Sequence, residues 1–156
     1  MLRVNYTTYD LRCEQDYIKL PTHPNIMVLC PDGPEPHPYW YARVIGIFHA
    51  IVDHPNLSDG TRMDFLWVCW YGSDINHTSS TSGFQARRLP RIRFVEDTND
   101  TEASPAFGFV DPGNVIRSVY LVPIYGEGRR ADLLGPSMAC SPSEGNEDFC
   151  LYYVNL

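Results

Sequence analysis

Two long apolar runs, rich in aromatic and β-branched residues, constrain the fold of this chain more than any other feature. The runs are HPYWYARVIGIFHAIV (37–52) and RMDFLWVCWYG (62–72), and together they hold all three tryptophans of the sequence. Such residues are typical of β-strands. The connection between the runs ends in Asp59-Gly60, a residue pair favoured in tight hairpin turns. We therefore expect a long antiparallel hairpin at the centre of the fold.

The remainder of the chain predicts further short strands around this hairpin. Its 13 prolines and 11 glycines lie mostly between short apolar runs, which is typical of β-proteins with many connections. A length of 156 residues with 44% hydrophobic content is sufficient for one packed core. We therefore predict a mainly β protein, with residues 1–156 forming a single β-barrel interaction domain. Further strands are expected at 2–11, 25–30, 91–96, 120–125 and 149–156.

Local patterns predict two helical turns and the faces of the strands. Residues 14–20 can form one turn before a proline ends it, and Asp111 followed by Pro112 fits the start of another turn around Val115 and Ile116. In 91–96 the alternation directs Ile92 and Phe94 inward, away from the flanking arginines. In the first long run the same rule assigns one face to Trp40, Ala42, Val44, Gly46 and Phe48.

The net charge and the absence of targeting signals limit the classes of partner and the cellular locations expected for this chain. A net charge of −7 opposes broad binding to nucleic acid, since neutralising phosphates requires an excess of Lys and Arg. The sequence has neither a long apolar run for a membrane span nor an N-terminal signal peptide, and its five scattered cysteines suit reduced thiols. We expect a nuclear or cytoplasmic protein that is not secreted and has no membrane partner. The abrupt apolar C-terminus indicates a fragment of a longer protein.

The sequence contains no motif that indicates catalysis, a metal or a cofactor. It has no C-x2-C pair, no G-x-S-x-G elbow and no Walker lysine after the glycine-containing segment GEGRR. We therefore predict no catalytic residue, no metal and no cofactor, and we expect that the chain is not an enzyme.

Several sequence blocks carry a family likeness. The blocks WYARVIGIF, VCWYG, FVDPGNVIRSVYLVPIYGEGRRADLL and FCLYYVNL occur in an order that resembles the C-terminal region of transposase-derived proteins of mushroom-forming fungi (basidiomycetes), of the Plavaka or KDZ type. In such transposases the catalytic acidic residues belong to an upstream RNase H-like region. The resemblance therefore implies a non-catalytic module in a transposase-derived protein.

A second resemblance concerns the order of the strands. An Ala-Arg-Val strand leading to Ile-Phe, a Val-x-Trp-Tyr strand, and a short helix followed by Val-Tyr-Leu-Val-Pro are similar to the bromo-adjacent homology (BAH) module and to SH3-like chromatin readers. This implies an SH3-like or BAH-like barrel with one or two short helices, long polar loops and a role in chromatin binding.

Two candidate binding sites follow. A chromatin reader holds a methylated ammonium of a histone peptide in a cage of aromatic rings, commonly beside a carboxylate. The predicted cage consists of Tyr39, Trp40, Trp67, Tyr71 and Asp74, although core packing is the alternative role for such rings. The other candidate is a DNA-contacting accessory domain of a transposase, whose arginine-rich strand follows a phosphate backbone with Arg87, Arg88, Arg91 and Arg93.

Overall fold

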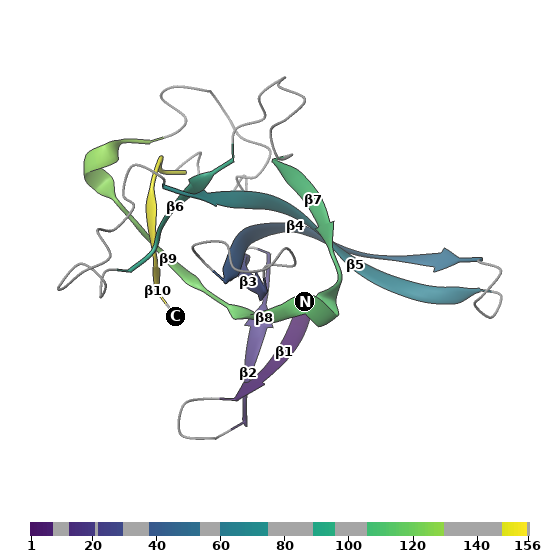
Figure 1. Ribbon diagram of the computed structural model, residues 1–156. Helices are drawn as coiled ribbons and strands as arrows, with labels where there is room; N and C mark the ends of the chain where they lie inside the picture. The colour runs from purple at the N-terminus through teal and green to yellow at the C-terminus, as the bar shows by residue number, and fades with distance from the viewer. Residues whose placement is uncertain are drawn as a thin grey trace.

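The computed structural model of this chain consists mainly of β-strands, which confirms the mainly β character predicted from the sequence (Figure 1). It describes residues 1–7, 13–20, 22–29, 38–53, 60–74, 89–95, 106–129 and 148–155. The helices within these ranges are single 3₁₀ turns, η3 (Pro112–Asn114) and η4 (Tyr125–Glu127). The strands are β1 (Leu2–Thr7), β2 (Cys13–Ile18), β3 (Asn25–Leu29), β4 (Tyr39–Val52), β5 (Thr61–Ser73), β6 (Arg91–Phe94), β7 (Phe107–Val110), β8 (Val115–Ser118), β9 (Tyr120–Pro123) and β10 (Tyr152–Asn155).

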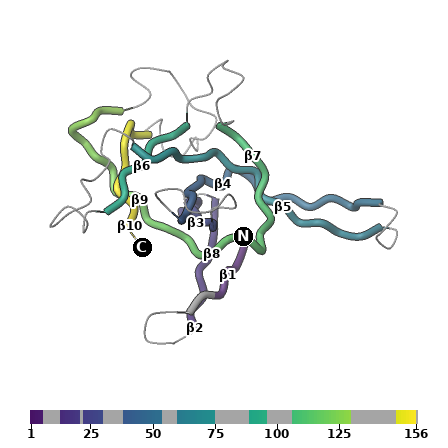
Figure 2. Tube along the Cα trace, in the orientation of Figure 1, coloured from purple at the N-terminus to yellow at the C-terminus, as the bar shows by residue number. Residues whose placement is uncertain are grey.

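The strands form one large sheet and one separate hairpin. The large sheet has the order β8-β3-β4-β5-β6-β10-β9, and β7 pairs with β5 outside this path. The separate hairpin is β1–β2, which projects from one side of the sheet, whereas the far half of β4–β5 projects from another (Figure 2). The long central hairpin predicted from the sequence is therefore present. Its turn region ends at Gly60, whose φ of 73° is favourable for glycine and whose N–H donates to Asp53 Oδ1 at 2.7 Å.

The large sheet is open, which differs from the closed barrel that the sequence predicts. Its path of hydrogen-bonded strands begins at β8 and ends at β9, and these two end strands are consecutive in the chain. Only Val119 separates them, and its N–H donates to the carbonyl of Asn25 at 3.0 Å. One extended segment, 115–123, thus supplies both ends of the sheet, first beside β3 and then beside β10. The SH3-like or BAH-like relationship is not established by this topology.

A bulge in β4 changes which side chains share a face. Val44 lies opposite Val68, but the next paired residue is Gly46, opposite Trp67, so Ile45 is the extra residue. An extra residue reverses the alternation beyond it. Ile47 therefore packs with the core cluster that contains Val44, whereas unbroken alternation predicts Phe48 on that face. That part of the face assignment is wrong, since sequence alternation alone does not reveal a bulge.

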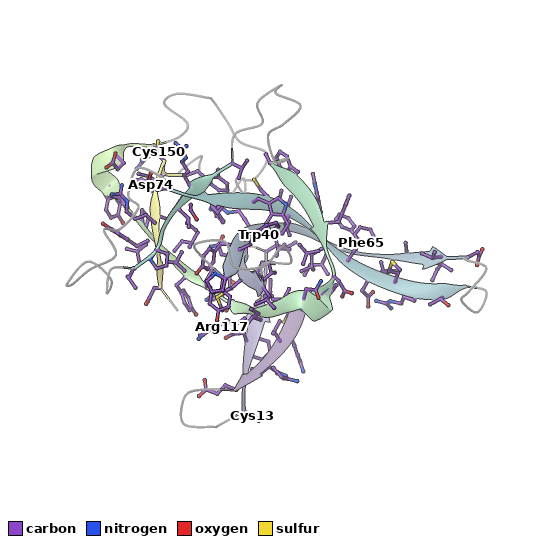
Figure 3. The ribbon with its side chains drawn as sticks, viewed as in Figure 1. Cys13, Trp40, Phe65, Asp74, Arg117 and Cys150 are labelled. Atoms are coloured by element: carbon purple, nitrogen blue, oxygen red, sulfur yellow. The ribbon has the colours of Figure 1, made fainter. Side chains whose placement is uncertain are left out.

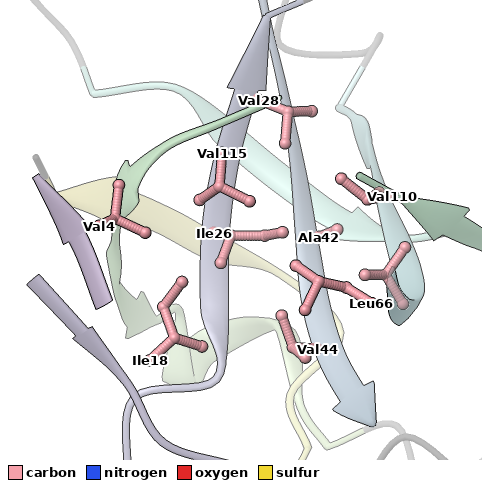
Figure 4. Close-up of a cluster of buried hydrophobic side chains, with 10 residues drawn as sticks. Val4, Ile18, Ile26, Val28, Ala42, Val44, Leu66, Val110 and Val115 are labelled. Atoms are coloured by element: carbon pink, nitrogen blue, oxygen red, sulfur yellow. The ribbon is translucent and has the colours of Figure 1, made fainter. Parts of the chain in front are cut away.

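Two hydrophobic clusters lie on opposite faces of β3, β4 and β5. The first cluster is covered by the β1–β2 hairpin and by β7 and β8 (Figure 4). The second is enclosed by β6, β9 and β10. The first cluster comprises Val4, Ile18, Ile26, Val28, Ala42, Val44, Leu66, Val68, Val110 and Val115. The second comprises Met27, Tyr41, Cys69, Tyr71, Ile92, Phe94, Val119, Tyr152 and Val154.

The helical turn predicted at 14–20 is wrong. Residues 13–18 form β2, which pairs with β1 along its whole length. Asp16 fixes this hairpin to β8, since its Oδ2 accepts from the backbone N–H of Ser118 at 3.0 Å. The segment forms a strand because burial of Ile18 in the first cluster outweighs a weak local helix preference.

The turn predicted at Asp111 is present. Asp111 caps η3, and its Oδ1 accepts from the N–H of Gly113 at 2.8 Å. The turn ends earlier than expected, because Val115 and Ile116 belong to β8.

Candidate functional site

The five residues predicted to form an aromatic cage do not lie around one space. Tyr39 and Tyr71 belong to one face of the sheet, since Tyr41 lies directly opposite Tyr71 and Tyr39 is two residues away. Trp40 lies on the other face, where its ring meets the ring of Trp70 edge to face at 5.6 Å. The cage arrangement thus has no geometric support, and the assignment of a ligand to these residues stays a prediction.

Tyr71 is fully engaged in the second core cluster. Its ring packs against Phe94 at 4.5 Å, and its hydroxyl donates to Asn25 Oδ1 at 3.0 Å and accepts from Arg43 Nε at 3.1 Å. Burial raises its pKa, and the positive charge of Arg43 offsets this only in part. Tyr71 therefore has the alternative role predicted for these aromatic residues, which is core packing.

Asp74 belongs to an ion-pair group that also includes one of the candidate DNA-binding residues. Its Oδ2 lies 3.4 Å from Arg91 Nε, and Glu127 Oε1 lies 3.4 Å from Arg91 Nη2. The guanidinium also faces the ring of Tyr153 at 5.9 Å. Two carboxylates therefore compensate the charge of Arg91, which leaves little attraction for a phosphate.

The other candidate arginines divide into two groups. Arg93 is exposed on the outer face of β6, as the alternation predicted, while Ile92 and Phe94 are buried beneath that strand. Arg87 and Arg88 lie outside the described residues. The segment that carries Arg91 and Arg93 is thus confirmed as a strand, and contact of the four arginines with DNA stays a prediction.

A buried polar network was not anticipated from the sequence. Arg43 Nη1 lies 2.7 Å from Asp148 Oδ1, and the two side chains are only 8% and 7% exposed. The Tyr152 hydroxyl donates to the same Asp148 oxygen at 3.3 Å and accepts from the N–H of Phe149 at 2.8 Å. The Arg43 guanidinium also stacks 4.9 Å from the ring of Phe94. These contacts tie the chain immediately before β10 to the middle of β4.

The network shifts the pKa values of Arg43 and Tyr152, two of the groups that form it. Burial and the negative charge of Asp148 raise the pKa of Tyr152 to about 12. Burial lowers the pKa of Arg43, but the neighbouring Tyr71 and Asp148 favour the charged form, and the net direction is upward. The guanidinium thus stays charged, and the network has the character of a structural cross-link.

An exposed apolar surface follows the projecting part of the central hairpin. We call residues 47–52 and 61–65 the arm. Phe48 stacks on Phe65 at 5.7 Å, and Phe109 of β7 meets Phe65 edge to face at 5.5 Å. Figure 3 shows Phe65 where β7 crosses the base of the arm. The same face continues along the paired positions, and the resulting apolar strip comprises Phe48, Ala50, Val52, Met63, Phe65, Trp67 and Phe109.

The strip is open to solvent although its members are apolar. The exposed fractions are 47% for Phe48, 51% for Met63 and 71% for Phe109. Trp67, the one cage candidate within the strip, is half-buried and packs against Phe107 at 6.0 Å. The strip lies along the projecting end of the central hairpin.

Gly46 explains how the strip is shaped at its base. A Cβ on Gly46 would stand 2.1 Å from the Phe48 ring, so the ring lies directly over the glycine backbone. The missing side chain therefore provides the space in which Phe48 packs beside Phe65.

No metal site or membrane-spanning helix emerges from the described ranges. Within them, no group of three or more His, Cys, Asp or Glu side chains is arranged to hold a metal ion. None of the helices there has the length and apolarity that a membrane crossing requires.

Comparison with known proteins adds no relative. No family model matches this chain, and no curated protein or solved structure matches it either. The resemblance to transposase-derived and BAH proteins thus stays a prediction, and functional inference rests on the geometry of the chain itself.

Proposed function

We propose that this chain is a non-catalytic interaction module that binds an apolar segment of a partner protein on the apolar strip. The observation that carries the proposal is the exposure of Phe48, Met63 and Phe109 on one continuous surface. Exposed apolar patches of this kind are typical of protein interaction sites, and aromatic side chains dominate the binding energy of such sites.

The chemistry of the strip favours an apolar ligand over a methylated ammonium. A cage for a cation profits from a nearby carboxylate. Asp64, the acidic residue within the arm, lies on the opposite face and forms an ion pair with Arg62 at 2.8 Å. Recognition of a methylated histone tail by the cage residues, in a transposase-derived protein, is the alternative function, and the same experiment tests it.

The test is a binding screen of the purified chain against an array of modified histone peptides and unmodified apolar peptides. Replacement Phe109→Glu should weaken any specific binding by about tenfold or more, because it places a charge at an aromatic contact. The matched control is Tyr125→Glu, since Tyr125 is 74% exposed but lies on η4, away from the strip.

The result that overturns the proposal is binding that Phe109→Glu leaves unchanged. Dependence of a peptide hit on methylation and on Trp40→Ala would instead favour the cage. Equal losses of peptide binding in the Phe109 and Tyr125 variants would also contradict the strip as the binding site, because they would show that added negative charge alone reduces binding.

A further inference from the structure

The arm extends beyond every other strand among the described residues. β3 pairs with β4 only at residues 39–43, and β7 pairs with β5 only at residues 66–69. Among the described residues, the ribbon from residue 48 outward thus has two strands, and no other described strand pairs with either of its edges (Figure 1). A two-stranded ribbon is marginally stable in water by itself and requires packing on one face.

The two faces of the arm differ in chemistry. The apolar strip occupies one face and holds no charged residue. The opposite face presents His49, Ile51 and the ion pair between Arg62 and Asp64. An amphipathic ribbon whose apolar face is exposed is suited to being covered by another apolar surface.

The edge of the arm lacks the usual protection against pairing between chains. From residue 46 to residue 52, β4 contains neither proline nor a Lys, Arg, Asp or Glu. Natural edge strands commonly carry charges or prolines that prevent association. The arm therefore combines an open apolar face with an unprotected edge.

The net charge of the chain restricts which surfaces of two copies can meet. Each copy carries −7, so two copies repel one another wherever their charged surfaces meet. Contact through the uncharged strip avoids this repulsion. A two-fold axis across the strip would bring identical apolar surfaces together without pairing like charges.

The area of the strip is consistent with a dimer at the lower limit of specific interfaces. At about 200 Å² for a large side chain, the open fractions of Phe48, Met63 and Phe109 amount to roughly 340 Å². With the half-buried members of the strip added, two copies would bury about 1,000 Å² in total. Much of the energy gained by burying this apolar area offsets the cost of association. The expected affinity is therefore in the micromolar range.

We propose that the occupant of the strip is a second copy of this chain, and that two arms pack strip against strip about a two-fold axis. This inference rests on the proposed function, since it assigns a partner to the same surface.

The experiment is sedimentation velocity of the full chain over a micromolar concentration series. The mass of the parent should rise from that of one chain to that of two. Met63→Glu should remain a monomer throughout, and Ala50→Glu, directly opposite it, serves as a second variant in case the first fails to fold. Ile51→Glu is the matched control, since Ile51 is 64% exposed on the opposite face of the same arm and should dimerise like the parent. Far-UV circular dichroism of each variant verifies folding.

Three outcomes would overturn the inference: a parent that is monomeric at every concentration, association that Met63→Glu and Ile51→Glu impair equally, or open-ended growth beyond two copies. A monomeric parent that still binds array peptides in a manner sensitive to Phe109→Glu would remove the dimer and leave the proposed function standing. A monomeric parent without such binding would contradict both the dimer and the proposed function.

Discussion

Arg43 of β4 and Asp148, 105 residues further along the chain, form an ion pair of 2.7 Å in the interior. The pair secures the segment that precedes β10, and β10 in turn lies between β6 and β9 in the sheet. Removing one partner therefore affects the attachment of the last strand as well as the local charge.

We expect Asp148→Ala to lower the free energy of unfolding by about 3–5 kcal/mol, since it leaves the Arg43 charge buried without its carboxylate. Urea unfolding measures the change. The matched control is Asp64→Ala, because the Arg62–Asp64 pair has a similar distance of 2.8 Å but side chains that are 62% and 53% exposed. That replacement should cost less than about 1 kcal/mol.

Replacing both partners should separate the cost of an unpaired charge from the value of the pair. The double variant Arg43→Met, Asp148→Leu should be more stable than Asp148→Ala alone, because no charge then remains in the interior. A double variant as unstable as the single one would contradict this explanation and assign the loss to the tyrosine hydrogen bonds.

Stability should fall at alkaline pH through Tyr152. Burial, with a further contribution from Asp148, raises its pKa to about 12 in the folded chain, compared with about 10 in the unfolded chain. Between these values the folded state binds more protons, so the free energy of unfolding decreases as pH rises. The stabilisation is complete below about pH 10 and is lost toward pH 12, and Tyr41 and Tyr71 act in the same direction, because burial also raises their pKa values.

Urea midpoints measured from pH 8 to 11.5 test this expectation. Tyr152→Phe should reduce the dependence on pH, since phenylalanine has no hydroxyl to ionise. An unfolding free energy that stays constant above pH 10 would show that these tyrosines ionise equally in both states.

Gly46→Ala should disturb the apolar strip without adding charge. The new Cβ would require the Phe48 ring to move away from its position 2.1 Å distant. We expect a change in near-UV circular dichroism and a stability loss of about 1 kcal/mol. Gly126→Ala is the control, since a Cβ there would meet no atom within 4 Å. Identical spectra for parent and Gly46→Ala would exclude the close packing of Phe48 on the glycine.

Duplex DNA should not be retained by this chain at physiological salt. The charge of Arg91 is compensated by Asp74 and Glu127, and the net charge of −7 repels phosphates. A filter-binding series from low to physiological salt measures retention. Binding that decreases steeply with salt and disappears in the double variant Arg91→Ala, Arg93→Ala would instead support the DNA-contacting role.

The sequence by itself determined several local elements of this protein. The two apolar runs became β4 and β5, the glycine before β5 adopts the expected positive φ, and Asp111 caps its turn. The alternation in β6 also directed Ile92 and Phe94 into the core. These features depend on backbone sterics and on hydrogen bonds over a few residues, so neighbouring residues are sufficient to predict them.

Only the tertiary structure decided which aromatic residues are core and which are surface. The bulge at Ile45 moved Phe48 to the outer face, and distant strands enclosed Tyr71. The pairing of Arg43 with Asp148 likewise depends on β10 entering the sheet. Burial of a strand face depends on which remote segment covers it, and the sequence of that strand does not contain this information.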